Sequence, residues 1–438
     1  MEFSYRGNYR YTTSDKMVYD NMRDGLWPDG SITGQEWNEG LSNRFRNTFY
    51  NQEFQVGFRQ VRKAYNLNAG ISVNGAMSQS KDLINSARDI KTRWAWSVAP
   101  YARFRYKFSN TRNLNFRYFM RANQPSITQL QPVADESNPL NIVIGNPELK
   151  PTFNHNINLR FSDFAQGSQR SIMAMMNVDF AQNSIVSTTT YDELTGGRVT
   201  SYTNVDGVWS AMAMNMLSFP FGPTKLWYFT SHLFARYAVT KGINNGIENR
   251  SNTLRLNYSP GLAFRNGVFD LEVRPTYSFQ NTANSVLKSN TRNIHTYGGM
   301  FNGTYSAPFG LVISTDLRYS TTSGYTSGYN TRQWIWNGSL AYQFLRDKQA
   351  ALTLSVYDIL GQQKNVFRNV TGDYIEDVIY NSLGRYGLLT FTYRFTTFKK
   401  GEQPKDRDDY RGGPGRFGGG GPGGPGGRPG GFGGGRPF

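Results

Sequence analysis

Residues 94–108 of the chain read WAWSVAPYARFRYKF, and this stretch decides the fold. Every second position is apolar, namely Trp94, Trp96, Val98, Pro100, Ala102, Phe104, Tyr106 and Phe108. The positions between them include Ser97, Arg103, Arg105 and Lys107. Successive side chains of a β-strand point to opposite faces, so this alternation produces one apolar and one charged face only if the stretch is a strand.

The same alternation predicts sixteen strands along the chain. They cover residues 1–13, 44–60, 64–80, 91–108, 111–121, 152–164, 170–188, 198–218, 225–240, 250–264, 267–281, 291–306, 310–322, 331–345, 350–360 and 386–398. Strands of soluble proteins usually have about 5–6 residues, whereas a strand that crosses a membrane needs about 9–11. The predicted strands are therefore long enough to cross a bilayer.

The connections between these strands alternate between short turns and longer loops. The longer loops are expected at 14–43, 81–90, 122–151, 189–197, 241–249, 282–290, 323–330 and 361–385. An outer-membrane barrel has this plan, with short periplasmic turns, long outer loops, an apolar face toward lipid and a polar face toward the lumen. We therefore expect an all-β fold, a transmembrane antiparallel up-and-down β-barrel in the cell outer membrane, with outer-membrane lipid as its surroundings.

The composition agrees with half-apolar strands and excludes several other classes of protein. Of the 438 residues, 38% are hydrophobic and 15% are aromatic, the formal charge is +17, and there is no cysteine. A chain without cysteine has no disulfide framework, thiolate metal site or cysteine nucleophile. A transmembrane helix needs about 20 consecutive apolar residues, and the sequence contains no such run. The segment Met1 to Arg6 does not resemble a signal peptide, so the chain is expected to be mature, cytoplasmic or a fragment.

Two regions are expected, the barrel at 1–398 and a charged, then Gly-, Pro- and Arg-rich tail at 399–438. This composition cannot bury a core, so we expect a disordered periplasmic tail. The sequence Arg411-Gly412-Gly413 is similar to RGG-type RNA-binding segments. An RGG-tailed RNA-binding protein is accordingly a minor alternative, and no nucleic-acid partner is expected.

Three stretches carry a family resemblance. They are Ser355-Val356-Tyr357-Asp358-Ile359-Leu360-Gly361-Gln362, then Leu383-Gly384-Arg385-Tyr386-Gly387-Leu388-Leu389-Thr390-Phe391-Thr392-Tyr393-Arg394-Phe395, and Gly145-Asn146-Pro147-Glu148-Leu149-Lys150-Pro151. They resemble the Bacteroidetes outer-membrane β-barrel proteins of the TonB-dependent receptor type. The resemblance covers most of residues 1–398 and implies uptake of a nutrient such as a glycan, a peptide or a chelate.

The resemblance also implies a 22-stranded barrel, a plug domain and a segment that binds TonB. The sixteen predicted strands would then be the C-terminal part of the barrel, with about six strands missing before them. Further implied partners are the barrel-insertion machinery and a surface lipoprotein. Sixteen is also the strand number of porins, so a stand-alone porin-like pore, or a structural or adhesin barrel without energy coupling, is an alternative.

The lumen face is the first candidate for function. By alternation it carries Arg59, Arg103, Arg105, Arg117, Arg160, Arg236, Arg255, Glu272, Arg274, Asp316, Arg318 and Arg394. One interpretation is a basic channel that attracts anionic solutes or acidic sugars. The simpler interpretation is a set of ion pairs, such as Glu272 with Arg274, that hold strands or a plug in place.

The outer loops are the second candidate, because loops often carry binding residues. Trp27 and Trp37 stand near carboxylates in loop 14–43, and Tyr374 and Tyr380 lie in loop 361–385. Packing over the barrel mouth is the alternative role for these loops. No catalytic motif of a hydrolase, metalloprotease or phosphate-binding enzyme occurs, and three isolated histidines offer little for a metal site. We expect no enzyme activity, no cofactor and no bound metal.

Overall fold

The computed structural model describes residues 1–21, 35–40, 42–135, 138, 140–165, 167–192, 194, 196–286, 288, 291–325, 331–345, 348–363, 366–370, 375–379 and 384–395. Strands dominate these residues, with one short 3-10 turn, η1 (Ser86–Arg88), and one short helix, α1 (Ile127–Leu130). Among the described residues no helix is long and apolar enough to cross a membrane. The predicted tail at 399–438 lies outside the described residues, as do Trp27, Tyr374 and Tyr380.

A single sheet of 19 strands forms the body of the molecule. Three of them, β8 (Asn141–Val143), β11 (Ser184–Tyr191) and β12 (Arg198–Val205), lie at one rim, and the other sixteen form the wall. The wall strands are β1 (Glu2–Lys16), β4 (Asn43–Val61), β5 (Tyr65–Asp82), β6 (Ile90–Lys107), β7 (Arg112–Asn123), β9 (Thr152–Ala165), β10 (Arg170–Gln182), β13 (Val208–Phe221), β14 (Trp227–Asn244), β15 (Ile247–Arg265), β16 (Phe269–Asn284), β17 (Arg292–Ser306), β18 (Leu311–Ser323), β19 (Thr331–Phe344), β20 (Ala350–Tyr357) and β23 (Tyr386–Tyr393).

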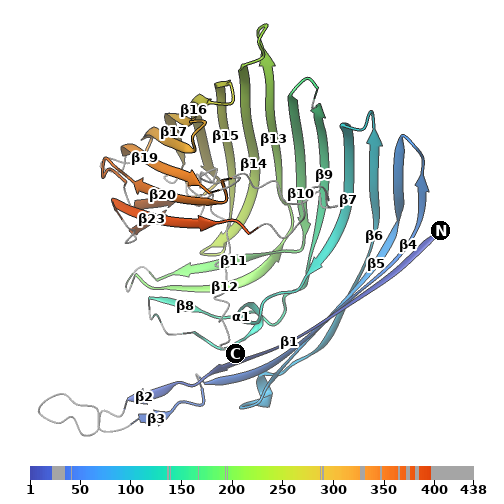
Figure 1. Cartoon of the computed structure of the whole chain (residues 1–438). Helices are drawn as coiled ribbons and strands as arrows, with labels where there is room; N and C mark the ends of the chain where they lie inside the picture. Colours follow the sequence, from blue (N-terminus) through green and yellow to red (C-terminus); the bar gives the residue numbers. More distant parts are fainter. Residues whose placement is uncertain are drawn as a thin grey trace, which may run out of the picture.

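Each wall strand pairs antiparallel with the next one along the chain, so the wall is an up-and-down arrangement. Figure 1 shows the sheet curling around a common interior, with the turns between β4 and β5, β6 and β7, β9 and β10, and β13 and β14 along the upper rim and the rim strands below. Two small hairpins stand apart from this sheet, β2 (Tyr19–Asn21) with β3 (Gln35–Trp37), and β21 (Val366–Val370) with β22 (Ile375–Ile379). The predicted all-β, antiparallel up-and-down architecture with about sixteen long strands is confirmed.

Within the described residues, the first and last strands of the wall each pair with one wall strand only. β1 pairs with β4, and β23 pairs with β20. No described register joins β1 to β23, and Figure 1 shows the two strands apart. The described wall is therefore a strongly curved sheet with two free edges.

Two predicted strands are each broken in the structure. The predicted strand at 170–188 is interrupted at Asn183, and that at 198–218 is interrupted at Asp206 and Gly207. Asn183 and Gly207 have positive φ angles of 52° and 84°, and the Asn183 amide donates to the Asp206 carboxylate at 2.8 Å. The two breaks lie next to each other, and beyond them the β11–β12 hairpin is separate from the wall. β12 then pairs in parallel with β8.

The predicted long loop at 241–249 is wrong. β14 continues to Asn244 and β15 begins at Ile247, so only Asn245 and Gly246 connect them. Both have positive φ angles, 48° and 78°. An Asn-Gly pair in this conformation makes the two-residue turn that matches the twist of a β-hairpin. The connections therefore do not alternate strictly in length.

A small apolar cluster fixes the rim strands. Ile90, Leu130 and Leu149 are buried together, with Ile185 of β11 and Tyr202 of β12 packed against them. Leu149 belongs to the Gly-Asn-Pro-Glu-Leu-Lys-Pro stretch, and Asn146 of the same stretch donates to the Tyr202 carbonyl at 2.9 Å. This stretch therefore attaches the β11–β12 hairpin to the loop between β7 and β9.

Candidate functional site

The outward face of the wall is apolar and exposed. Phe54, Val56 and Phe58 of β4 are 43%, 52% and 52% exposed, and Val98 of β6 is 68% exposed. Soluble monomers rarely expose apolar patches larger than a few hundred Å², whereas a lipid-facing barrel surface requires them. The exposed rings of Trp94, Trp96, Trp227, Trp334 and Trp336 lie on this face as well.

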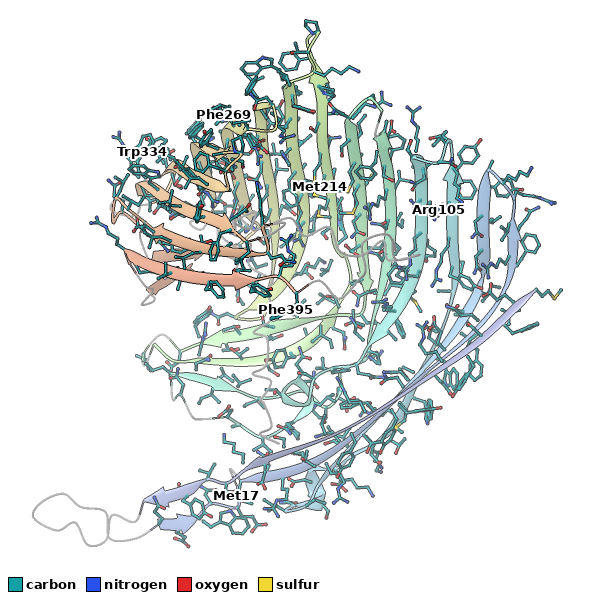
Figure 2. All side chains as sticks on the ribbon, in the orientation of Figure 1. Met17, Arg105, Met214, Phe269, Trp334 and Phe395 are labelled. Atoms are coloured by element: carbon teal, nitrogen blue, oxygen red, sulfur yellow. The ribbon has the colours of Figure 1, made fainter. Side chains whose placement is uncertain are left out.

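The strand registers place eleven of the twelve predicted lumen residues on the inward face. Directly opposed residues on paired strands share a face, and successive registers connect Arg59, Asn68, Arg103, Arg117, Asn158, Asn177, Met212, Arg236, Arg255 and Gln280 in one row. Arg105 and Arg160 lie in the neighbouring row, and Glu272, Arg274, Asp316 and Arg318 share the same face further along the sheet. Arg394 follows directly after β23, and its backbone amide donates to the Gln349 carbonyl at 2.8 Å. Arg105 and Met214, labelled in Figure 2, belong to β6 and β13, with β7, β9 and β10 between them.

Two of the predicted arginines are held by carboxylates on their own strand. Arg274 contacts Glu272 at 2.6 Å, and the Thr230 hydroxyl donates to the same carboxylate at 3.1 Å. Arg318 contacts Asp316 at 3.0 Å. Both carboxylates are largely buried, so each is satisfied by its arginine rather than by water. Ion pairing within the wall accounts for these four residues.

Four other arginines face like charges instead. The register places Arg103 directly opposite Arg117, and Arg236 directly opposite Arg255. Within the described residues none of the four has an ion-pair partner, and the buried Nε of Arg255 has no hydrogen-bond partner. Like charges directly opposite one another destabilise a strand pair. Strand stability therefore does not explain these two pairs.

Three further residues of this face were not predicted from the sequence. Arg6, Phe119 and Arg121 line a cavity of about 200 Å³ together with Arg103 and Arg117. The guanidinium carbons of Arg117 and Arg121 lie 4.4 and 4.8 Å from the centre of the Phe119 ring. The alternation of Arg117, Phe119 and Arg121 along one strand was visible in the sequence, but the contribution of Arg6 depends on the pairing of distant strands.

A stripe of methionines also went unrecognised. Met173 and Met175 of β10 are directly opposite Met216 and Met214 of β13, on the same inner face. The Arg160 side chain donates to the Met173 sulfur at 3.5 Å. This part of the inner face is therefore apolar and polarizable between two arginine-rich parts.

The predicted loop residues are only partly described. Trp37 lies in β3 opposite Tyr19 of β2, and its side chain is 44% exposed. The neighbouring Asn38 donates to the Asp20 carboxylate at 2.7 Å. Among the described residues there is no group of three or more histidine or acidic side chains placed to hold a metal ion.

Comparison with known proteins identifies the family. A model described as the outer membrane protein beta-barrel family matches residues 1–393. The chain belongs to this family. Members of the family are outer-membrane barrels, so this barrel is located in the outer membrane, and its exposed apolar face meets lipid.

The chain is also similar, at low identity, to several solved structures. OmpT, an outer membrane protein of Vibrio cholerae, is 9% identical with a TM-score of 0.33, and the match covers 90% of this chain and 99% of that one. The FrpB iron transporter of Neisseria meningitidis (F3-3 variant) is 10% identical with a TM-score of 0.33, covering 89% and 69%. Salmonella typhi OmpF in complex with daunomycin is 11% identical with a TM-score of 0.27, covering 90% and 97%. No protein with a curated description matches the chain.

Proposed function

We propose that this barrel is the wall of a TonB-dependent uptake receptor of the Bacteroidetes type, which carries a nutrient such as a glycan, a peptide or a chelate across the outer membrane. The proposal rests on one observation: in the described residues, β1 and β23 each have one edge without a paired strand. Unpaired backbone groups cannot face hydrocarbon, so a barrel in lipid must be closed. Further strands before β1, of the same protein, would close the wall in the way the family resemblance implies.

The polar inner face supports a transport function. Sixteen strands and further ones would surround a wide lumen, and the inner face of this wall carries arginines that no described carboxylate neutralises. The lumen of 22-stranded outer-membrane transporters is filled by a plug. The partners that the family resemblance implies are a plug domain, TonB, a surface lipoprotein and the barrel-insertion machinery. The proposed region 399–438 is a periplasmic extension without a part in the membrane.

The mass of the mature protein tests the proposal. The chain of 438 residues has a mass of 49.6 kDa. We expect mass spectrometry of the protein purified from native outer membranes to give a much larger mass, with peptides that precede Met1. A mature protein of 49.6 kDa would contradict the receptor proposal.

A stand-alone pore is the second candidate, because sixteen strands can close into a porin-sized barrel by themselves. It predicts that the purified 438-residue chain conducts ions in a planar bilayer without any other component. The receptor proposal predicts no stable open channel from this chain alone.

A further inference from the structure

The cavity on the inner face is lined by residues of five neighbouring wall strands, β1, β4, β5, β6 and β7. Arg6 comes from β1, Glu53 from β4, Arg103 from β6, and Arg117, Phe119 and Arg121 from β7. Its volume is about 200 Å³, enough for a small solute rather than a single water molecule. The lining contains four guanidinium groups and one carboxylate, so the cavity is strongly cationic.

The single carboxylate does not neutralise this charge. Glu53 contacts Arg6 at 3.3 Å and also accepts a hydrogen bond from Gln55 at 2.7 Å. Arg103, Arg117 and Arg121 have no ion-pair partner among the described residues. Arg117 instead lies in the repulsive field of Arg103, Arg121 and Arg6. A surplus of three positive charges therefore remains around one cavity.

Phe119 holds two of these guanidinium groups in place. Arg117 and Arg121 lie over its ring at 4.4 and 4.8 Å, at distances at which the ring attracts a cation. Stacking fixes the plane of a guanidinium and leaves its N–H groups free at the edge. Such edges match the oxygen pairs of carboxylate, phosphate and sulfate groups in a bidentate manner. The cavity is thus preorganised for oxyanions.

We propose that this cavity binds a small solute that carries two or more oxyanion groups, whether carboxylate, phosphate or sulfate. The proposal rests on the proposed function in one respect, since the solute must enter the lumen to reach the inner face. An anionic lipid headgroup is not the occupant, because the cavity lies on the face opposite to the lipid-facing side chains. The bound anion would relieve the repulsion between Arg103 and Arg117.

Calorimetry tests the proposal with the protein as it is purified in detergent from native outer membranes, with pyrophosphate and citrate as probes and glucose as the neutral comparison. We expect both anions to bind, glucose not to bind, and affinity to fall as salt rises. Arg103→Gln and Arg117→Gln should each weaken binding by roughly tenfold. Arg160→Gln is the matched control, an inward arginine of the neighbouring strand β9, and should bind like the wild type. No anion binding, or an equal loss in Arg160→Gln, would overturn the proposal.

Unfolding temperature separates a binding role from a structural one. Without anion, Arg117→Gln should unfold at the wild-type temperature or above it, because one repulsive charge is removed. Pyrophosphate should raise the unfolding temperature of the wild type and of Arg160→Gln but not that of Arg117→Gln. A lower unfolding temperature of Arg117→Gln without anion would show a structural role and contradict the proposal. If Arg117→Gln does not fold, the same unfolding temperatures are measured for Arg103→Gln and Arg121→Gln, with the same expected results.

The outcome is independent of the mass measurement that tests the receptor proposal. A mature protein of 49.6 kDa would end the receptor proposal and leave anion binding by the cavity intact. A larger protein that fails to bind pyrophosphate and citrate would retain the receptor proposal and end this one.

Discussion

Asp358 shows how a single side chain ends a wall strand. It directly follows β20, is buried and has a positive φ angle of 47°. Its carboxylate accepts hydrogen bonds from the backbone amides of Gln362 and Gln363, both at 3.0 Å, and its own amide donates to Asn337 at 2.9 Å. The carboxylate therefore satisfies backbone donors at the point where the strand pairing stops.

We expect Asp358→Ala to lower the free energy of unfolding by about 2 kcal/mol, because two backbone amides lose their acceptor. Asp358→Asn keeps an acceptor oxygen and should lose less. Urea unfolding of both variants, refolded in detergent, measures the difference. Equal stability of Asp358→Ala and the wild type would show that the carboxylate does not order this turn.

At the same scale, the sequence predicted the face of each residue but not its partner. Alternation placed Arg274 and Arg103 on the inner face equally well. The partner of Arg274 is Glu272, two residues away on the same strand, so that pair was foreseeable. The residue opposite Arg103 is set by the register of β6 against β7, which alternation alone leaves undetermined. The cavity was missed for this reason.

At the scale of elements, strand existence was predictable and strand interruption was not. Long alternating segments specify strands strongly because one face must be apolar throughout. The breaks at Asn183 and Gly207 leave that alternation almost undisturbed, so the pattern did not predict a separate β11–β12 hairpin. The Asn245-Gly246 pair is itself a signal for a two-residue hairpin turn. Because polar residues surround this pair, the segment was predicted as a longer loop.

This turn provides a prediction at the scale of elements. Gly246 has a φ angle of 78° and open space around an added Cβ, so Gly246→Ala is strained only by its backbone conformation. We expect a loss of about 1 kcal/mol of unfolding free energy. Gly167→Ala, in another turn with equally open space and no positive φ, is the matched control and should leave stability unchanged. Equal effects of the two substitutions would contradict the two-residue turn.

At the scale of the whole molecule, the fold follows from the distribution of apolar residues. Only 38% of the residues are hydrophobic, which is low for a chain of this length with a single buried core. A lipid-facing wall needs apolar residues on one side of each strand only, and the described outward face has them at Phe54, Leu256 and Trp334. The chain needs no large interior core because the membrane covers its apolar side.

The central claim is that alternate residues of one strand meet lipid and lumen. Residues 1–438 contain no cysteine, so each introduced cysteine is the single thiol of this region, and labelling of the unsubstituted protein gives the background. We propose Leu256→Cys, Asn257→Cys, Tyr258→Cys and Ser259→Cys on β15, each treated in outer membranes with a membrane-impermeant maleimide. Labelling at 257 and 259, with protection at 256 and 258, is the predicted result. Uniform labelling, or labelling at 256 and 258 alone, would contradict the account.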